Sequence, residues 1–183
     1  MSLPFDDITV DVQASRVGGT SPSFAKLTDD GAGSLGIYAN RFNGGANNDI
    51  YFGLQLPHAW AQGTVIHPHL HWCPETNIAN GETVHWVLEW TWCNIDGVVG
   101  ASTVNSTVAY TSSGTTAAKT HILTELDDMV GTGKTVSSLV YGRIQRQSQG
   151  AGADTFAGNV FLLAFDIHVQ KDAHGSLNEF YKP

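Results

Sequence analysis

The sequence has few charged residues, and basic ones are scarce. Aspartate, glutamate, lysine and arginine make up 14% of the 183 residues, whereas an average soluble domain has roughly 25%. Nine residues are lysine or arginine, seventeen are acidic, and the formal net charge is −8. The cations form no cluster along the chain. We therefore expect neither a nucleic-acid partner nor binding to an anionic membrane surface.

Long hydrophobic runs are also missing. The longest, VFLLAF at 160–165, is far shorter than the roughly 20 residues that span a bilayer. The start, MSLPFDDITVD, lacks the basic and apolar regions of a secretory signal. We expect a soluble protein that is made in a cytoplasm, where Cys73 and Cys93 would be free thiols.

In place of charge, the sequence has glycine, small polar residues and short alternating apolar runs. Turn signals recur between these runs about every 10 residues, and no long amphipathic helix is indicated. Strands are expected at 50–56, 64–73, 83–95, 102–112, 135–147 and 160–171. The segment 120–127 fits either a strand or one short helix. This pattern predicts an all-β sandwich, jelly roll or barrel.

Composition divides the chain into three parts. Residues 1–48 are rich in Gly, Asn, Ser, Asp and Thr, and we expect an extended N-terminal arm with at most short strands at 8–12 and 35–40. Residues 49–171 carry the strand pattern and form the expected sandwich. Residues 172–183 are expected to be a C-terminal tail. On this division, a deletion of residues 1–30 should leave a folded domain.

The stretch HPHLHWCPE at 67–75 raises the main functional question. Alternation in a strand places its three histidines on one face and Leu70 and Trp72 on the other. If this strand forms a hairpin with 83–95, matching the apolar faces gives a tryptophan-rich core layer. The opposite face would then gather His67, His69, His71, His85 and Glu89. Pro68 has no backbone N–H to donate to a neighbouring strand, so we expect this strand to lie at a sheet edge or to carry a bulge.

Imidazole and carboxylate groups are the usual ligands of zinc and related metals. The spacing resembles the first motif of the cupins, which are β-barrel metalloproteins, over Gly63-x5-His69-x-His71-x3-Glu75-x5-Gly81. The resemblance implies His69, His71 and Glu75 as metal ligands in a cupin-like metal-dependent enzyme.

The sequence departs from the cupin pattern in two ways. The gap between Glu75 and Gly81 is one residue shorter than in the cupin motif. The second cupin motif is absent, and only His174-x3-Asn178 resembles its end. Two other interpretations of the histidines therefore stay open. They can be the polar face of a sheet, or they can hold a structural metal ion on the axis of a trimer.

Other candidate motifs are weaker. GTGKT at 131–135 looks like the end of a P-loop, but Asp128 stands where its first glycine belongs and a strand follows, so we expect a turn. The tryptophans at alternate strand positions are typical of a core. For a sugar-binding surface, the candidates are Trp60, Tyr110 and Tyr141.

The run LPHAWAQGTVIHPHLHW at 56–72, followed by VHWVLEWTWCNIDG at 84–97, resembles a group of tailed-bacteriophage virion proteins. These carry a similar P-H-x-W…P-H-I/L-H-W block, then an aromatic strand and a Gly-rich C-terminal half. The resemblance covers about residues 50–170. It implies a jelly-roll-like β-sandwich that serves as a virion structural component, with no catalytic residues and no cofactor.

The hypothesis that follows is a non-enzymatic capsid decoration, or cement, protein on the capsid surface. Its partners would be the major capsid protein and further copies of itself, as a homodimer or homotrimer. Attachment is expected through the arm 1–48 and the loop 148–159. A phage tail or receptor-binding component is the nearest alternative.

Overall fold

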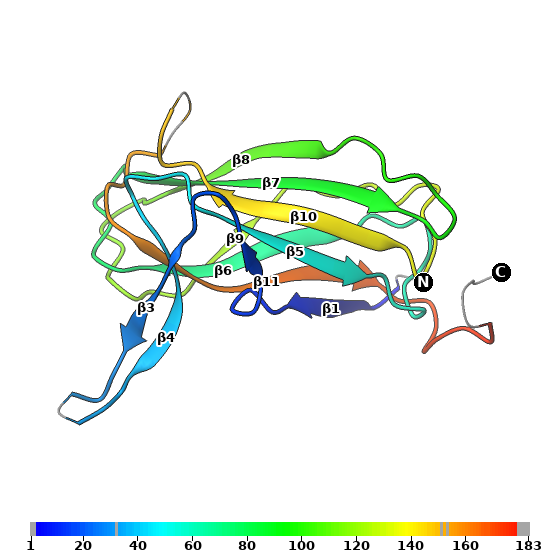
Figure 1. Cartoon of the computed structure of the whole chain (residues 1–183), viewed down its shortest axis with the longest axis horizontal. Coiled ribbons are helices and arrows are strands. Elements are labelled where there is room, and N and C mark those ends of the chain that lie inside the picture. The colour runs from blue at the N-terminus through cyan, green and yellow to red at the C-terminus, as the bar shows by residue number, and fades with distance from the viewer. Residues whose placement is uncertain (1–2, 32, 151, 153, 179–183) are drawn as a thin grey trace.

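The computed structural model describes residues 3–31, 33–150, 152 and 154–178, with residues 105–108 described by their backbone only. These residues form two antiparallel β-sheets packed face to face, so the predicted all-β sandwich is confirmed (Figure 1). No helix that could span a membrane occurs among the described residues.

Each sheet draws strands from the whole length of the chain. Sheet I has the order β3-β4-β11-β6-β9, with β1 also paired to β11. Its strands are β1 (Phe5–Val10), β3 (Ser23–Thr28), β4 (Ile37–Phe42), β6 (His67–Pro74), β9 (Ile122–Glu125) and β11 (Val160–Gln170). Sheet II has the order β2-β5-β10-β7-β8. Its strands are β2 (Arg16–Val17), β5 (Asp49–Gln55), β7 (Thr83–Cys93), β8 (Thr103–Thr111) and β10 (Leu139–Arg146).

The core lies between the sheets and is rich in aromatic residues. Trp72 of β6 and Trp86 of β7 are fully buried, and their ring centroids are 6.1 Å apart. Phe42 meets Trp86 edge-on at 5.3 Å. Aromatic side chains of this kind bury roughly 150–250 Å² each, so these few residues supply much of the apolar area that holds the two sheets together.

The expected hairpin between β6 and β7 does not form. β6 pairs with β11 and β9, whereas β7 pairs with β10 and β8, so the two strands lie in opposite sheets. Side chains alternate along both strands as predicted, but the tryptophan-bearing faces of β6 and β7 pack against each other across the core instead of lying next to each other in one sheet. Both arrangements bury the same tryptophans, and the connection 75–82 is long enough to cross the roughly 10 Å between packed sheets.

This crossing changes the expected histidine cluster. His85 and Glu89 belong to β7 and therefore lie on the outer face of sheet II, away from His67, His69 and His71. The expectation for Pro68 is also corrected, because β6 is an interior strand. Pro68 lies at the end of the pairing between β9 and His69 to Trp72, where its carbonyl still accepts a hydrogen bond from Leu126 N at 2.9 Å.

The expected N-terminal arm contributes strands to both sheets. β1 and β4 pair along the same edge of β11, β2 pairs with β5, and β3 pairs with β4. The boundary expected at residue 48 has no counterpart in this pairing, and deleting residues 1–30 would remove three strands. The β3–β4 hairpin extends beyond the body of the sandwich (Figure 1).

The turn at GTGKT and the C-terminal tail agree more closely with the prediction. Residues 132–133 form a turn before β10, as expected for GTGKT, and Lys134 Nζ donates to the carbonyl of Trp92 at 2.8 Å. After β11 the described tail to residue 178 contains no strand, and Ser176 Oγ lies 2.5 Å from His58 Nδ1.

Candidate functional site

The outer face of sheet I carries histidines and carboxylates from neighbouring strands. β6 contributes three histidines, β11 contributes an aspartate and a histidine, and the segments around β1 and β9 contribute the rest. This histidine face consists of Asp7, His67, His69, His71, His121, Asp128, Asp166 and His168.

An irregularity in β11 decides which residues meet. Leu162 pairs with Trp72, but the next pair is Ala164 with His71, so β11 has one extra residue, Leu163, at this point. The register beyond this β-bulge places Asp166 opposite His69. If Leu163 were paired in the regular register of Leu162 and Trp72 instead of bulging out, Asp166 would fall opposite Pro68. The bulge therefore brings the carboxylate to the histidines.

Two imidazoles approach the single carboxylate of Asp166. His69 Nε2 lies 2.9 Å from Oδ2, and His71 Nε2 lies 3.1 Å from Oδ1. The His69 side chain is 5% exposed, that of Asp166 is 10% and that of His71 is 23%. The group is thus largely removed from water and open on the His71 side.

Further residues hold these rings in place. His71 Nδ1 lies 2.7 Å from His121 Nε2, so His71 is fixed at both of its ring nitrogens. The ring of His168 lies 4.1 Å from that of His69, and His168 Nε2 is 2.8 Å from Asp7 Oδ1. Polar contacts therefore join His69, Asp166, His71 and His121, and ring packing between His69 and His168 adds the His168–Asp7 pair to this group.

Two shallow hollows flank the group. One of about 330 Å³ is lined by residues that include His67, His69 and His168. The other, of about 300 Å³, is lined by residues that include His71, His121 and Asp166. Small solutes can therefore approach the carboxylate and its histidines from solvent.

Glu75 is not brought to this group. Its carboxylate accepts hydrogen bonds from Asn159 Nδ2 at 2.6 Å and from Arg41 Nη1 at 3.3 Å. Burial raises the pKa of Glu75, but these hydrogen bonds outweigh it and the net effect is a lowered pKa. Of the three sequence-predicted ligands, the structure joins His69 and His71, and Asp166 occupies the place expected for the carboxylate.

The candidates for sugar stacking lie in different environments. Trp60 is fully buried. Tyr110 packs edge-on against Trp72 at 5.3 Å, and its hydroxyl lies 2.7 Å from Thr116 Oγ1. Tyr141 is half exposed on sheet II and lines a hollow together with Tyr51. These residues do not form a shared platform.

Alternation in the expected strand 160–171 puts Asp166 and His168 on its polar side but does not connect them with β6. The missing information was the pairing of β6 with β11, which joins segments far apart in the chain. His121 precedes β9 and offered no periodic signal. A search for histidines and carboxylates on all predicted strands would have named Asp166 as a candidate.

The sequence matches no protein-family model and no curated protein. Solved structures resemble it distantly. A chain of infectious bursal disease virus, Gt strain, has a TM-score of 0.42 and 8% identity over 95% of this chain and 34% of the viral one. The CBM22-1 xylan-binding domain from Paenibacillus barcinonensis has 0.41 and 11%, over 94% of this chain and 100% of the domain. Latent PorU from Porphyromonas gingivalis has 0.39 and 11%, over 94% of this chain and 13% of PorU. Likeness at this level does not extend to function.

Proposed function

We propose that this chain is a non-catalytic structural protein of a tailed-bacteriophage particle, which binds the major capsid protein on the outside of the head. The resemblance of the block at 56–72 to phage virion proteins supports the class of protein. The observation that carries the attachment surface is an apolar row on the projecting β3–β4 hairpin that no other part of the described chain covers.

This row continues the inward-facing side of sheet I beyond the sandwich. Along β4, Phe42 and Asn40 face the core and are buried, and the next residue of the same row, Tyr38, is 43% exposed. Phe24 lies opposite Asn40, is 63% exposed and stacks on Tyr38 with 5.7 Å between ring centroids. Exposed apolar surface next to a core edge is typical of a protein-binding site.

The other face of the hairpin is held against the body. Ala25 and Leu27 pack on a small cluster formed by Ala39, Cys73 and Phe161. Because this contact fixes the hairpin, its exposed row is presented without the cost of ordering a flexible arm on binding. A preformed surface suits a protein that attaches to an assembled shell.

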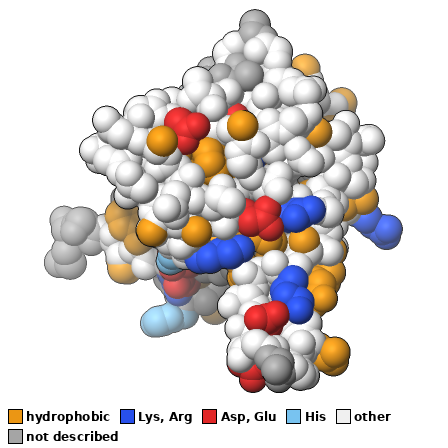
Figure 2. All heavy atoms as spheres, turned by 90° about the vertical axis from the view of Figure 1, so that its left-hand side faces the viewer, with side chains coloured by type: hydrophobic (Ala, Val, Ile, Leu, Met, Phe, Trp, Pro, Cys, Tyr) orange, Lys and Arg blue, Asp and Glu red, His pale blue; other side chains and the backbone are white. Residues whose placement is uncertain are grey.

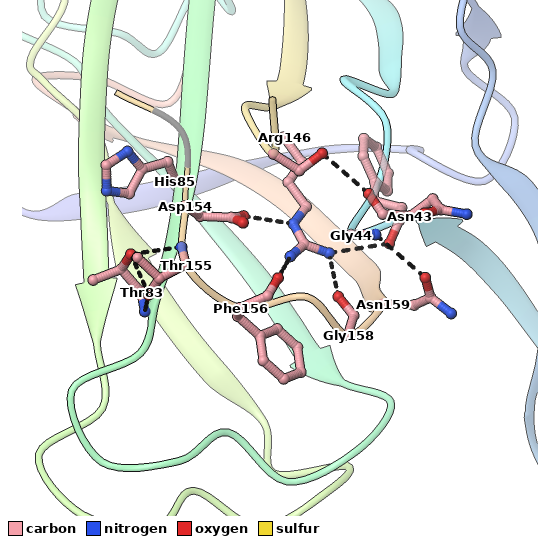
Figure 3. Close-up of polar contacts among 12 residues, drawn as sticks. Asn43, Gly44, Thr83, His85, Arg146, Asp154, Thr155, Phe156, Gly158 and Asn159 are labelled. Carbon is pink, nitrogen blue, oxygen red and sulfur yellow. Dashed lines mark hydrogen bonds and ion pairs between the residues drawn. The ribbon is translucent and has the colours of Figure 1, made fainter. Parts of the chain in front are cut away.

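The loop 148–159, the second expected attachment segment, lies at the same end of the sandwich as the hairpin (Figure 1). Figure 2 looks onto this end, where hydrophobic side chains lie among a few charged ones. The described part of the loop is anchored by Arg146, which is fully buried (Figure 3). Its Nε donates to Asp154 Oδ2 at 2.7 Å, and its Nη1 donates to the carbonyl of Gly158 at 2.7 Å.

The proposal assigns the sandwich end with β3, β4 and the loop 148–159 to the major capsid protein. Further copies of this chain complete the assembly as a homodimer or homotrimer. A cupin-like enzyme is less well supported, because Glu75 is engaged by Arg41 and Asn159.

The test uses the full-length chain with Phe24→Ser and Tyr38→Ser combined. Both side chains are exposed, so the variant should keep the wild-type melting temperature within a few degrees. Its affinity for heads assembled from the major capsid protein of the same phage should fall at least about tenfold, or 1.4 kcal/mol. The matched control is Tyr141→Ser, which removes an exposed aromatic from sheet II and should bind normally.

Sedimentation of heads with bound protein gives the measurement. Wild-type binding by the double variant would refute the role of the hairpin. If wild-type protein sediments with tails and not with heads, the capsid assignment is wrong and the tail alternative replaces it.

A further inference from the structure

We propose that His69, His71 and Asp166 bind a divalent transition-metal ion, with Zn²⁺ as the best fit. This inference is independent of the virion role, because it rests on the histidine face of sheet I and not on the β3–β4 hairpin. Two imidazole nitrogens and one carboxylate oxygen are a common set of protein ligands for zinc, with one coordination position left open.

The ligand atoms already have nearly the spacing that an ion requires. One ligand atom from each of the three residues can be chosen so that all lie within 4.8 Å of one another. Nε2 of His69 and Nε2 of His71 lie 2.9 Å and 3.1 Å from the Asp166 oxygens. Tetrahedral zinc with bonds of about 2.0–2.1 Å separates its ligands by about 3.3 Å. The two separations between histidine and carboxylate therefore need only a few tenths of an ångström of expansion, and the separation between the two imidazole ligand atoms is at most 4.8 Å.

Asp166 supplies a second and independent observation. Its side chain is 10% exposed, yet its Oδ1 is buried without a hydrogen-bond partner. His71 Nε2 is close to this oxygen, at 3.1 Å, but does not meet the geometry of a hydrogen bond. A buried carboxylate oxygen left unpaired is costly, and a cation between Asp166 and the two rings would satisfy it.

The surroundings of His71 match those of a metal-bound imidazole. Coordination through Nε2 would leave the proton on Nδ1, and His121 Nε2, 2.7 Å from Nδ1, is placed to accept it in a hydrogen bond. Metal-binding histidines regularly donate this second N–H to a neighbouring group, which orients the ring. His121 is thus a positioning residue for His71 and is not itself a ligand.

The site is also accessible. The hollow of about 300 Å³ beside His71 and Asp166 is lined in part by Thr9 and His121 and opens to solvent. An ion can enter from this side, and water can occupy its open coordination position. The metal would join β6 to β11 next to the bulge in β11 and would stabilise sheet I.

The experiment titrates chelator-treated full-length protein with ZnCl₂ by calorimetry and with CoCl₂ by visible absorption. Wild-type protein should bind one equivalent per chain, show the d–d bands of cobalt with nitrogen and oxygen ligands, and melt at a higher temperature with Zn²⁺. His71→Ala and Asp166→Asn should lose this binding. His121→Ala should weaken it about 10- to 100-fold.

The matched control is His67→Ala. His67 lies on the same strand and face and contacts Asp128 instead of the proposed ligands, so its variant should bind metal as wild type does. His71 is partly exposed, so His71→Ala should fold and can decide the question even if Asp166→Asn does not. The proposal is overturned if wild-type protein binds neither ion, or if His71→Ala binds both as tightly as His67→Ala.

Discussion

Asp166 in β11 lies directly across from His69 in β6, and the two side chains meet with 2.9 Å between Oδ2 and Nε2. They meet because the β-bulge at Leu163 shifts the register by one residue. The same bulge allows Leu162 and Phe165, three positions apart, both to face the core, where both are fully buried. By absorbing Leu163, the bulge keeps Leu162 and Phe165 in the core and Asp166 on the histidine face.

Deleting Leu163 should be tolerated, which is unusual for a residue in an interior strand. Its removal leaves Leu162, Ala164 and Phe165 in regular alternation and keeps Asp166 opposite His69. We expect a folded protein that loses less than about 2 kcal/mol in its free energy of unfolding. Deleting Phe165 instead would force Ala164 into the core and cost about 3–5 kcal/mol. Urea denaturation of both variants measures the difference, and equal losses would contradict the role assigned to the bulge.

Asp154→Asn should strongly destabilise the protein. The Asp154 side chain is 1% exposed and that of Arg146 is fully buried, with 2.7 Å between Oδ2 and Nε. Removing the carboxylate charge leaves the guanidinium buried without its counter-ion, at a cost of about 3–5 kcal/mol. Guanidinium chloride denaturation checks the value. A loss below about 1 kcal/mol would mean that the ion pair does not stabilise the loop base.

Replacing both partners, by Arg146→Met with Asp154→Leu, should not restore stability. Apolar replacement of a buried ion pair is often neutral, but Arg146 also donates to the carbonyls of Phe42, Phe156 and Gly158. Each carbonyl left unpaired in the interior costs about 1–3 kcal/mol. The double variant should therefore remain at least as unstable as Asp154→Asn in the same assay, and wild-type stability would show that these carbonyl contacts contribute little.

The features that the sequence predicted correctly are those determined by residues adjacent in the chain. The alternation of Trp72 with His71, and of Trp86 with His85, fixes which side of each strand is buried. Because burying tryptophan is favourable wherever the opposing surface comes from, the pattern does not say which strand lies opposite. The side-by-side hairpin and the face-to-face crossing satisfy it equally, and the structure has the second.

The sequence could not predict the bulge in β11 for a related reason. In the run VFLLAF, residues on both sides of β11 are apolar, so a shift by one residue leaves no trace in the pattern. Strict alternation with Phe165 would put Phe161 and Leu163 in the main core, but they pack on the outer side of sheet I. The carboxylate of the candidate site depends on this register, and it could not be identified before the pairing of β6 with β11 was known.

Stability at low pH should depend on Glu75. Its pKa in the folded protein is below the ordinary value of 4.5, so the unfolded chain binds the proton more readily. The stabilisation by Glu75 is present above pH 4.5 and is lost as the pH falls through the lowered folded pKa. In urea denaturation between pH 7 and pH 3, Glu75→Gln should flatten the acid side of the stability curve. Arg41→Gln should do so in part, and an unchanged slope in both would contradict the prediction.

The two thiols should differ in reactivity. Cys73 is 2% exposed, and burial raises the pKa of its thiol, which lowers the fraction of reactive thiolate. Cys93 is partly exposed, near the end of β7. An aromatic disulfide reagent should label one thiol per native chain and two in denaturant. Cys93→Ser should abolish the native labelling while leaving one thiol to react after unfolding. Rapid labelling of Cys73 in the native Cys93→Ser variant would mean that the cluster of Ala39, Cys73 and Phe161 opens readily, and with it the base on which the β3–β4 hairpin rests.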